Sequence, residues 1–322
     1  MGITNEELLQ KATLTTSAFG GSSNGTAPLT IEQADQFIEL MSAQQVMLND
    51  VHVVKSPSNK WQEAIIDFSA RVARGGAEAT RLSASEQVVP TTGIVEISTV
   101  LLRAEVPISD EVMEDNVAGQ GFAQTVERTL ASRFGFDVED LMLNGNTESA
   151  DPYYKLMNGW IVEAQGEKGH VFNGEPEGQD YQLIFKSLLN KLPDRHKRNI
   201  EVDGRYYVPK RLEERYRDIL ASRGTPLGDL SLSGTQELRY QGILIVGVPA
   251  FVITEESGVA KSQVLLANRN NLYAGFRRSI TLETWRDPRE GATSFIVTAR
   301  VDAKVAVPDA TAIATNVDVT VN

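Results

Sequence analysis

Side chains that can exchange protons near neutral pH are few in this chain of 322 residues. The three histidines, His52, His170 and His196, lie far apart in the sequence and in polar surroundings. A histidine held beside a carboxylate can act as a general acid or base. The wide separation favours three ordinary surface side chains, although folding could still bring one of them beside a carboxylate.

Two acidic pairs, Glu114-Asp115 and Glu139-Asp140, are the next candidates for acid–base chemistry. Both pairs lie in stretches that we predict to be helical. Acidic pairs on a helix more often form a solvated face than a catalytic site. We therefore expect both pairs to lie at the surface.

The segment Gly119-Gln120-Gly121 is the nearest approach to a dinucleotide-binding glycine fingerprint. It lacks the third glycine and follows a predicted short helix, whereas the fingerprint follows a strand. The phosphate-binding loop, the paired-histidine zinc helix and the calcium loop are also missing. With no cysteine, thiolate nucleophiles and sulfur-ligated metals are excluded. The sequence therefore predicts no catalytic residue, no metal and no cofactor, and we do not expect an enzyme.

Basic side chains gather in residues 195–217, which could form a local basic patch. They are Arg195, Lys197, Arg198, Arg205, Lys210, Arg211, Arg215 and Arg217. Acidic residues lie between them, so salt pairs along helix surfaces are the favoured interpretation. The formal net charge of -12 also disfavours a protein that reads DNA sequence. No apolar stretch is long enough to span a bilayer and no secretion signal is recognisable, so we expect a cytoplasmic protein without membrane contact.

The first elements along the chain are a flexible arm and a helix. Residues 13–26 are rich in Thr, Ser, Gly, Ala and Asn, which is too polar a composition to bury a core. Thr30 and Gln33 have the spacing of a helix capping box. An apolar stripe of helical period follows, formed by Ile31, Ala34, Ile38 and Met41.

A projecting two-stranded finger is predicted next. Residues 61–72 and 95–108 both alternate apolar and polar side chains with the period of a strand. The polar segment between them, 73–93, is longer than compact domains usually leave as bare loop. Because a lone hairpin is at best marginally stable in water, such a finger implies another surface on which it lies.

A long helix is predicted within residues 109–145. Its apolar residues recur every four positions, at Phe122, Val126, Leu130, Phe134, Val138 and Met142. Asn144-Gly145 would end it with a left-handed cap. A spacing of four drifts around a helix of 3.6 residues per turn, so the helix should contact several elements in turn.

The remainder divides into a mixed lobe, residues 151–276, and two final strands. The lobe combines amphipathic helices with strand candidates at 206–208, 243–254 and 263–267. The final strands, 280–285 and 294–307, flank a turn. The fold class is therefore α+β.

This order of parts resembles the major capsid proteins of tailed bacteriophages, which have the Hong Kong 97 fold. Residues 106–115 are similar to the family's approach to its long spine helix, and Leu143-Asn144-Gly145-Asn146 to the exit from it. Residues 299–310 resemble the family's closing strand and its proline.

The resemblance implies five parts. They are an N-terminal arm (1–60), an extended loop (61–108), the spine helix of a peripheral domain (109–150), an axial domain (151–276), and peripheral strands with a C-terminal tail (277–322). The extended loop would lie over a neighbouring subunit, with contacts expected at Arg71, Arg74, Gly75, Gly76, Glu78, Arg81, Glu86 and Arg103.

The implied function is self-assembly, as hexamers and pentamers, into an icosahedral shell around a double-stranded DNA genome. The implied partners are other copies of the chain, a scaffolding protein and a portal, with a decoration protein as a further candidate. DNA would be enclosed without sequence-specific binding. Assembly would take place in the host cytoplasm and the product would be a virion.

One departure from some relatives concerns covalent welding, which joins a lysine of the extended loop to a neighbour's asparagine. No lysine occurs between Lys60 and Lys155, so we expect a non-covalent shell. The N-terminal region is also short for a built-in scaffold domain, which favours a separate scaffolding protein.

Three alternatives stay open at this point. An encapsulin-type nanocompartment resembles the same fold but encloses cargo enzymes, and cargo genes in place of portal genes nearby would identify it. The chain could be another phage structural protein. An enzyme with an unrecognised site in residues 151–276 would instead be a monomer with a deep polar pocket.

Overall fold

The computed structural model describes residues 45–67, 91–109, 111–112, 121–198, 200–222, 237–256, 258–277 and 281–320, and the single residues 73, 75 and 83. The predicted arm at 13–26 and the helix expected from Thr30 lie outside these ranges. The same holds for most of the segment between the two predicted finger strands.

The elements of the described part follow the chain in this order. The α-helices are α3 (Val46–Asp50), α5 (Gly121–Asn144), α6 (Trp160–Ala164), α7 (Tyr181–Lys191), α8 (Ile200–Asp203) and α9 (Lys210–Ala221). The first strands are β1 (His52–Ser56), β2 (Lys60–Asp67), β3 (Thr91–Ser98), β4 (Val100–Ser109), β5 (His170–Asn173), β6 (Gly204–Pro209) and β7 (Arg239–Tyr240). The later strands are β8 (Ile243–Val248), β9 (Thr254–Glu256), β10 (Val259–Asn268), β11 (Leu272–Arg277), β12 (Thr281–Asp287), β13 (Ala292–Val305) and β14 (Thr311–Asp318). Short 3-10 turns are η2 (Tyr154–Leu156), η3 (Glu175–Glu177), η4 (Asp194–His196), η5 (Arg269–Asn271) and η6 (Pro308–Ala310).

A five-stranded sheet is built around the long strand β13. β4 and β12 both pair antiparallel with the first half of β13, so they lie on its opposite edges. β11 pairs with the second half of β13, and β1 adds to β11 in parallel. The two final strands predicted from sequence are thus confirmed as β12 and β13, with ends shifted by one to two residues.

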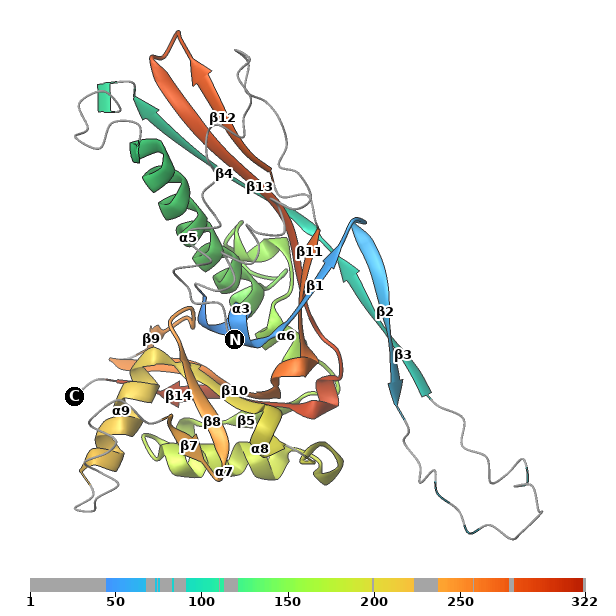
Figure 1. The fold of residues 1–322 in the computed structure, drawn as a ribbon. Helices are drawn as coiled ribbons and strands as arrows, with labels where there is room; N and C mark the ends of the chain where they lie inside the picture. Colours follow the sequence, from blue (N-terminus) through green and yellow to red (C-terminus); the bar gives the residue numbers. More distant parts are fainter. Residues whose placement is uncertain are drawn as a thin grey trace, which may run out of the picture.

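Helix α5 covers one face of this sheet (Figure 1). The alternation along β13 turns Phe295, Val297, Ala299 and Val301 inward, and all four are buried. The 24 residues of α5 give it a length of roughly 36 Å at 1.5 Å per residue. The sheet and helix therefore form one long, narrow body.

The end of α5 differs from the prediction. Gly145 does not have the positive φ of a left-handed cap. It is instead pressed against Gly159, whose N–H donates to the Gly145 carbonyl at 2.8 Å. A Cβ on Gly145 would lie 2.6 Å from the carbonyl oxygens of Leu141 and Met157. A glycine is needed at position 145 because two backbone segments approach closely there, and not because φ is positive.

A seven-stranded sheet forms the second body, in the order β5-β14-β10-β6-β8-β7, with β9 paired to β10. Helices α7 and α9 pack against it around a separate apolar core. The amphipathic helices predicted in the lobe are confirmed as α7 and α9. β14 belongs to this sheet, although the sequence grouped residues after 277 with the peripheral strands.

The hairpin β2–β3 leaves the body beside β1 and β11 of the five-stranded sheet (Figure 1). Its strands pair antiparallel from Lys60 with Ser98 to Asp67 with Thr91. The prediction of a single strand over 95–108 is wrong. β3 ends at Ser98, and after Thr99 the chain continues as β4 in the main sheet. Both strands have a period of two, but their apolar positions change from odd to even numbers at Thr99, and the prediction did not use this change of phase.

Candidate assembly site: the hairpin, its root and its supporting helix

The root of hairpin β2–β3 packs closely on the main sheet. Ile97 and Val95 are buried, and a Cβ added to Gly275 of β11 would lie 2.6 Å from Ile97 Cγ2. The same position would be 3.3 Å from two ring atoms of Trp61. Only glycine leaves room for these side chains, so the root is closely packed against β11.

Beyond the root, the hairpin presents side chains to solvent. Ile94 is 60% exposed, which is high for a β-branched apolar residue in a strand. Gln62 Nε2 donates to Glu96 Oε1 at 2.7 Å across the two strands. A two-stranded sheet with an exposed apolar side chain and no core of its own is suited to contact a partner.

The contact residues expected on the extended loop are only partly described. Arg71, Arg74, Gly76, Glu78, Arg81 and Glu86 lie outside the described residues. Gly75 is exposed, and a Cβ added to it would meet no atom within 4 Å. Arg103 lies on β4 and forms an ion pair with Glu105 at 3.2 Å, and the two side chains are 59% and 50% exposed. Its expected role between subunits stays a prediction.

The residues expected along the spine helix lie on α5. Leu130, Phe134, Val138 and Met142 are buried in the core that α5 shares with the five-stranded sheet. Val126 is partly buried and packs against the same core. Of the Phe122 side chain nothing is described. α5 contacts both β13 and α6, so it braces the sheet over its length.

Glu139 corrects the expectation that its acidic pair is solvated. It is 1% exposed, and its Oε2 accepts hydrogen bonds from the backbone N–H groups of Met47 and Leu48 at 2.9 and 3.1 Å. These are free donors at the first turn of α3, which a carboxylate satisfies well. Burial raises the pKa of Glu139, and the two backbone hydrogen bonds oppose that rise. The residue is an anchor between α3 and α5.

Its neighbour Asp140 is also engaged within the fold. Asp140 Oδ2 accepts a hydrogen bond from the Tyr154 hydroxyl at 2.8 Å, and Oδ1 accepts one from Asn144 Nδ2 at 2.7 Å. Burial raises the pKa of Asp140, against these two hydrogen bonds. The other pair, Glu114-Asp115, lies outside the described residues.

Two histidines meet at one carboxylate, which corrects the expectation of isolated surface residues. His170 Nε2 and His196 Nε2 lie 3.2 and 2.9 Å from the two carboxylate oxygens of Asp309. Arg195 also pairs with Asp309, and this contact is the main cause that lowers the pKa of Asp309 to about 2. Burial opposes the shift, and the His196 hydrogen bond adds to it. The cluster ties β5 and η4 to η6. His52 is exposed, with its ring edge-on to Tyr273.

The basic segment contains both surface pairs and one buried contact. Lys210 and Arg217 both pair with Glu213 on α9, as expected for helix-surface salt pairs. Arg205 differs, because it is buried and its Nε donates to Asp50 Oδ2 at 3.1 Å. Asp50 ends α3, so this pair joins the segment before β1 to the seven-stranded sheet.

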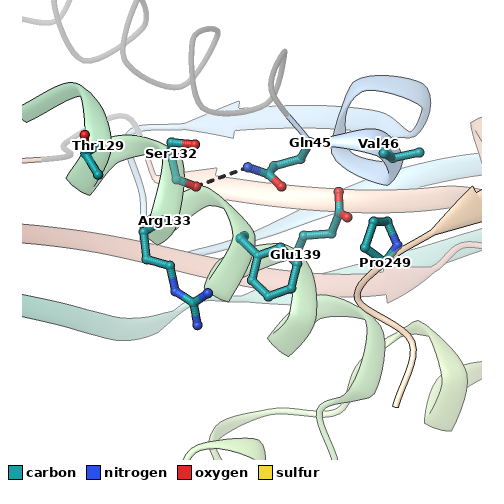
Figure 2. Close-up of a pocket in the computed structure, with 8 residues that line it drawn as sticks. Gln45, Val46, Thr129, Ser132, Arg133, Glu139 and Pro249 are labelled. Atoms are coloured by element: carbon teal, nitrogen blue, oxygen red, sulfur yellow. Dashed lines mark hydrogen bonds between the residues drawn. The ribbon is translucent and has the colours of Figure 1, made fainter. Parts of the chain in front are cut away.

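A hollow of 660 Å³ lies between α3 and α5 (Figure 2). Gln45, Val46, Arg133 and Pro249 are among its lining residues, and Gln45 Nε2 donates to the Ser132 carbonyl at 3.2 Å across it. The arrangement has no paired acid and base at hydrogen-bond distance. In the described ranges no cluster of three or more His, Cys, Asp or Glu side chains is placed to bind a metal ion. No described helix is long and apolar enough to cross a membrane.

The sequence did not reveal that Asp302, Glu139 and Asp309 each join distant segments of the chain. Asp302 lies on the polar phase of the last strand, between Arg300 and Lys304, so nothing in the alternation marks it as buried. Its partner Ser98 is distant in sequence. In Pro308-Asp309-Ala310 the proline is part of the family resemblance and draws attention to this segment. Nothing in the sequence around Asp309 indicates its partners.

Two solved structures of the capsid and encapsulin class share this fold. The satellite phage P4 procapsid, solved with its size determination protein, matches with a TM-score of 0.66 at 13% identity, over 98% of each chain. The SrpI encapsulin of Synechococcus elongatus PCC 7942 matches with a TM-score of 0.53 at 12% identity, over 100% of this chain and 98% of that one. These likenesses confirm a mixed α/β capsid-type fold.

Sequence comparison places the chain within that class. Residues 25–316 match the phage capsid family, and the chain belongs to this family. It is 29% identical over 314 residues to the putative prophage capsid protein YqbE of Bacillus subtilis (strain 168), covering 96% of this chain and 97% of YqbE. The chain is therefore a phage shell protein with a place in the virion, and it acts by self-assembly.

Proposed function

We propose that this chain is the major shell subunit of a tailed phage and that hairpin β2–β3 is the loop that lies on a neighbouring copy. The observation that carries the proposal is the hairpin itself. It has a complete eight-residue ladder and a buried root, yet it extends away from both sheets (Figure 1). Because a two-stranded sheet needs a further surface to be stable, a neighbouring subunit supplies what the chain lacks.

The remaining parts take roles in the same assembly. Residues 1–60 act as an arm, 61–108 as the extended loop and 109–150 as the spine. Residues 151–276 and 277–322 act as the axial part and the peripheral strands with tail. Two sheet pairings refine these boundaries: β4 is paired within the main sheet, and β14 within the seven-stranded one. The projecting part of the loop therefore ends at Ser98.

The shell is built from hexamers and pentamers that close an icosahedron around double-stranded DNA. The net charge of -12 supports a container that encloses DNA without gripping it. A separate scaffolding protein and a portal take part in assembly in the host cytoplasm, and a decoration protein is a further candidate partner. The chain has no catalytic role in this scheme.

Contacts between subunits are non-covalent, since the extended loop has no lysine between Lys60 and Lys155. Particles boiled in detergent are expected to give a single band near the chain mass of 35.3 kDa. A ladder of multimers would contradict this part of the proposal.

An encapsulin-type compartment is the second candidate, because the SrpI encapsulin shares the fold. Electron microscopy of the expressed full-length chain separates the candidates from a monomeric protein. Hollow icosahedral particles are expected, and a stable monomer at high concentration would overturn the proposal. Particles purified from a lysogen after induction are expected to contain DNA, whereas a packed enzyme would favour the compartment.

A further inference from the structure

Hairpin β2–β3 joins the body of the subunit at its root, between Asn59 and Thr99. The chain enters the hairpin after Asn59 and leaves it at Thr99. The Thr99 N–H and hydroxyl both donate to the Asn59 carbonyl, each at 3.0 Å. The two strands are thus tied together at the place where they join the body.

Asp302 of β13 contacts the root of the hairpin. It is 4% exposed, and its Oδ2 accepts a hydrogen bond from the Ser98 backbone N–H at 2.7 Å. Its Oδ1 accepts one from the N–H of the adjacent Ala303 at 2.9 Å. Asp302 is paired with Gly275, the residue over which Trp61 and Ile97 pack. The carboxylate therefore lies next to the packed root of the hairpin.

Few charged groups act on this carboxylate. Lys304 of β13 favours its ionised form, and Glu163 of α6 disfavours it. Lys304 and Glu163 also pair with each other. The hairpin contacts Asp302 through the Ser98 backbone N–H. Glu63 of β2 and Tyr273 of β11 are further titratable groups near the root, where burial and then the charge of Glu63 raise the pKa of Tyr273.

We propose that Asp302 is a protonation-dependent latch that holds the root of hairpin β2–β3 on the five-stranded sheet. A proton on Oδ1 displaces only the hydrogen bond from the adjacent Ala303 and leaves Oδ2 free to accept from Ser98. It also removes a buried charge. When the carboxylate is ionised, lifting of the root hydrates it, so ionisation favours the lifted state.

The direction of the pH effect follows from the pKa of Asp302. Burial raises it from 3.8 to about 6, against the Ser98 hydrogen bond and Lys304. Lifting the root exposes the carboxyl and returns its pKa toward the ordinary value. The latch is therefore fully effective below the ordinary pKa and weakens as the pH rises through about 6. These two pKa values correspond to a roughly tenfold easier opening at pH 8 than at pH 5.

Amide hydrogen exchange of the full-length, unassembled subunit tests the latch between pH 5 and pH 8. The Asp302→Asn variant is the reference at each pH, because its neutral side chain cannot ionise and the intrinsic pH dependence of exchange cancels in the ratio. For peptides covering residues 91–99, the wild-type to variant ratio of exchange rates is expected to rise roughly tenfold over this range. The ratio for α7 is expected to stay constant. A flat ratio at 91–99 would overturn the proposal.

Two further variants keep the test decisive. Glu96→Gln removes an exposed carboxylate on the same strand and should leave the midpoint unchanged. Glu163→Gln removes a charge that adds to the effect of burial in raising the pKa of Asp302, so the midpoint should move to lower pH. This second variant serves if Asp302→Asn does not fold, and an unmoved midpoint would then count against the latch. Because the measurement uses free subunits, its outcome is independent of whether shells form.

Discussion

The lobe around the seven-stranded sheet and the hairpin β2–β3 obtain their stability in opposite ways. In the lobe, β6 is buried along its whole length between β10 and β8. Phe185 of α7 contacts the rings of Tyr206, Tyr216 and Tyr240 in the middle of its core. Among the hairpin side chains that are described, Val95 and Ile97 at the root are buried and Ile94 is 60% exposed.

The difference separates folding from assembly. The lobe has a core large enough to fold without a neighbour, so its sequence is constrained by packing inside one chain. The hairpin has no core, so the constraint on its outer part comes from another surface. Changes in the lobe should therefore alter the stability of the subunit, whereas changes on the outer hairpin should alter assembly alone.

The largest effect is expected for Phe185→Ala in the lobe. The side chain is fully buried, and its removal should lower the free energy of unfolding by about 3–5 kcal/mol. Urea unfolding of the subunit measures this. Leu183→Ala on the same helix is the control, because Leu183 is 41% exposed and should change stability little. Equal effects of the two substitutions would break the claim that the lobe has its own core.

An intermediate effect is expected for Gly275→Val at the root of the hairpin. The added side chain collides with Ile97 and Trp61, and such overpacking costs about 1–3 kcal/mol. Limited proteolysis should then cleave the hairpin faster while the lobe stays protected. Gly75→Val is the matched control, since nothing lies within 4 Å of a Cβ there. Unchanged cleavage in the Gly275 variant would show that the root is not closely packed against β11.

The smallest effect on folding is expected for Ile94→Ser on the outer hairpin. The free energy of unfolding of the subunit should change by less than about 0.5 kcal/mol, since the side chain is exposed. The yield of assembled particles, measured by sedimentation, should nevertheless fall. Leu183→Ser is the control for loss of an exposed apolar residue elsewhere. A full yield from the Ile94 variant would contradict a role in subunit contact.

Much of the fold could be predicted because its patterns are local. The period of two along residues 294–307 identified β13, and the apolar spacing of Leu130, Phe134 and Val138 identified the buried face of α5. The likeness to capsid proteins added the order of the parts. The break at Thr99 was missed, although the apolar positions change phase there, from Val95 and Ile97 in β3 to Val100 and Leu102 in β4.

The polar centres could not be predicted, because each depends on partners far away in the sequence. Glu139 binds backbone groups 91 and 92 residues away, and Asp309 meets His170 and His196 across 139 and 113 residues. Asp302 reaches Ser98 over 204 residues. An acidic residue in a helix or strand has the same sequence signature whether it is solvated or buried. Only the tertiary contacts distinguish these cases.

The central claim is that the outer hairpin completes its packing on a neighbouring subunit. Amide hydrogen exchange of β2 and β3 in assembled particles, compared with free subunits and with α7 as the internal reference, tests it most directly. Residues 60–67 and 91–98 are expected to gain clear protection on assembly, with α7 unchanged. Particles in which the hairpin exchanges as fast as in free subunits would contradict it.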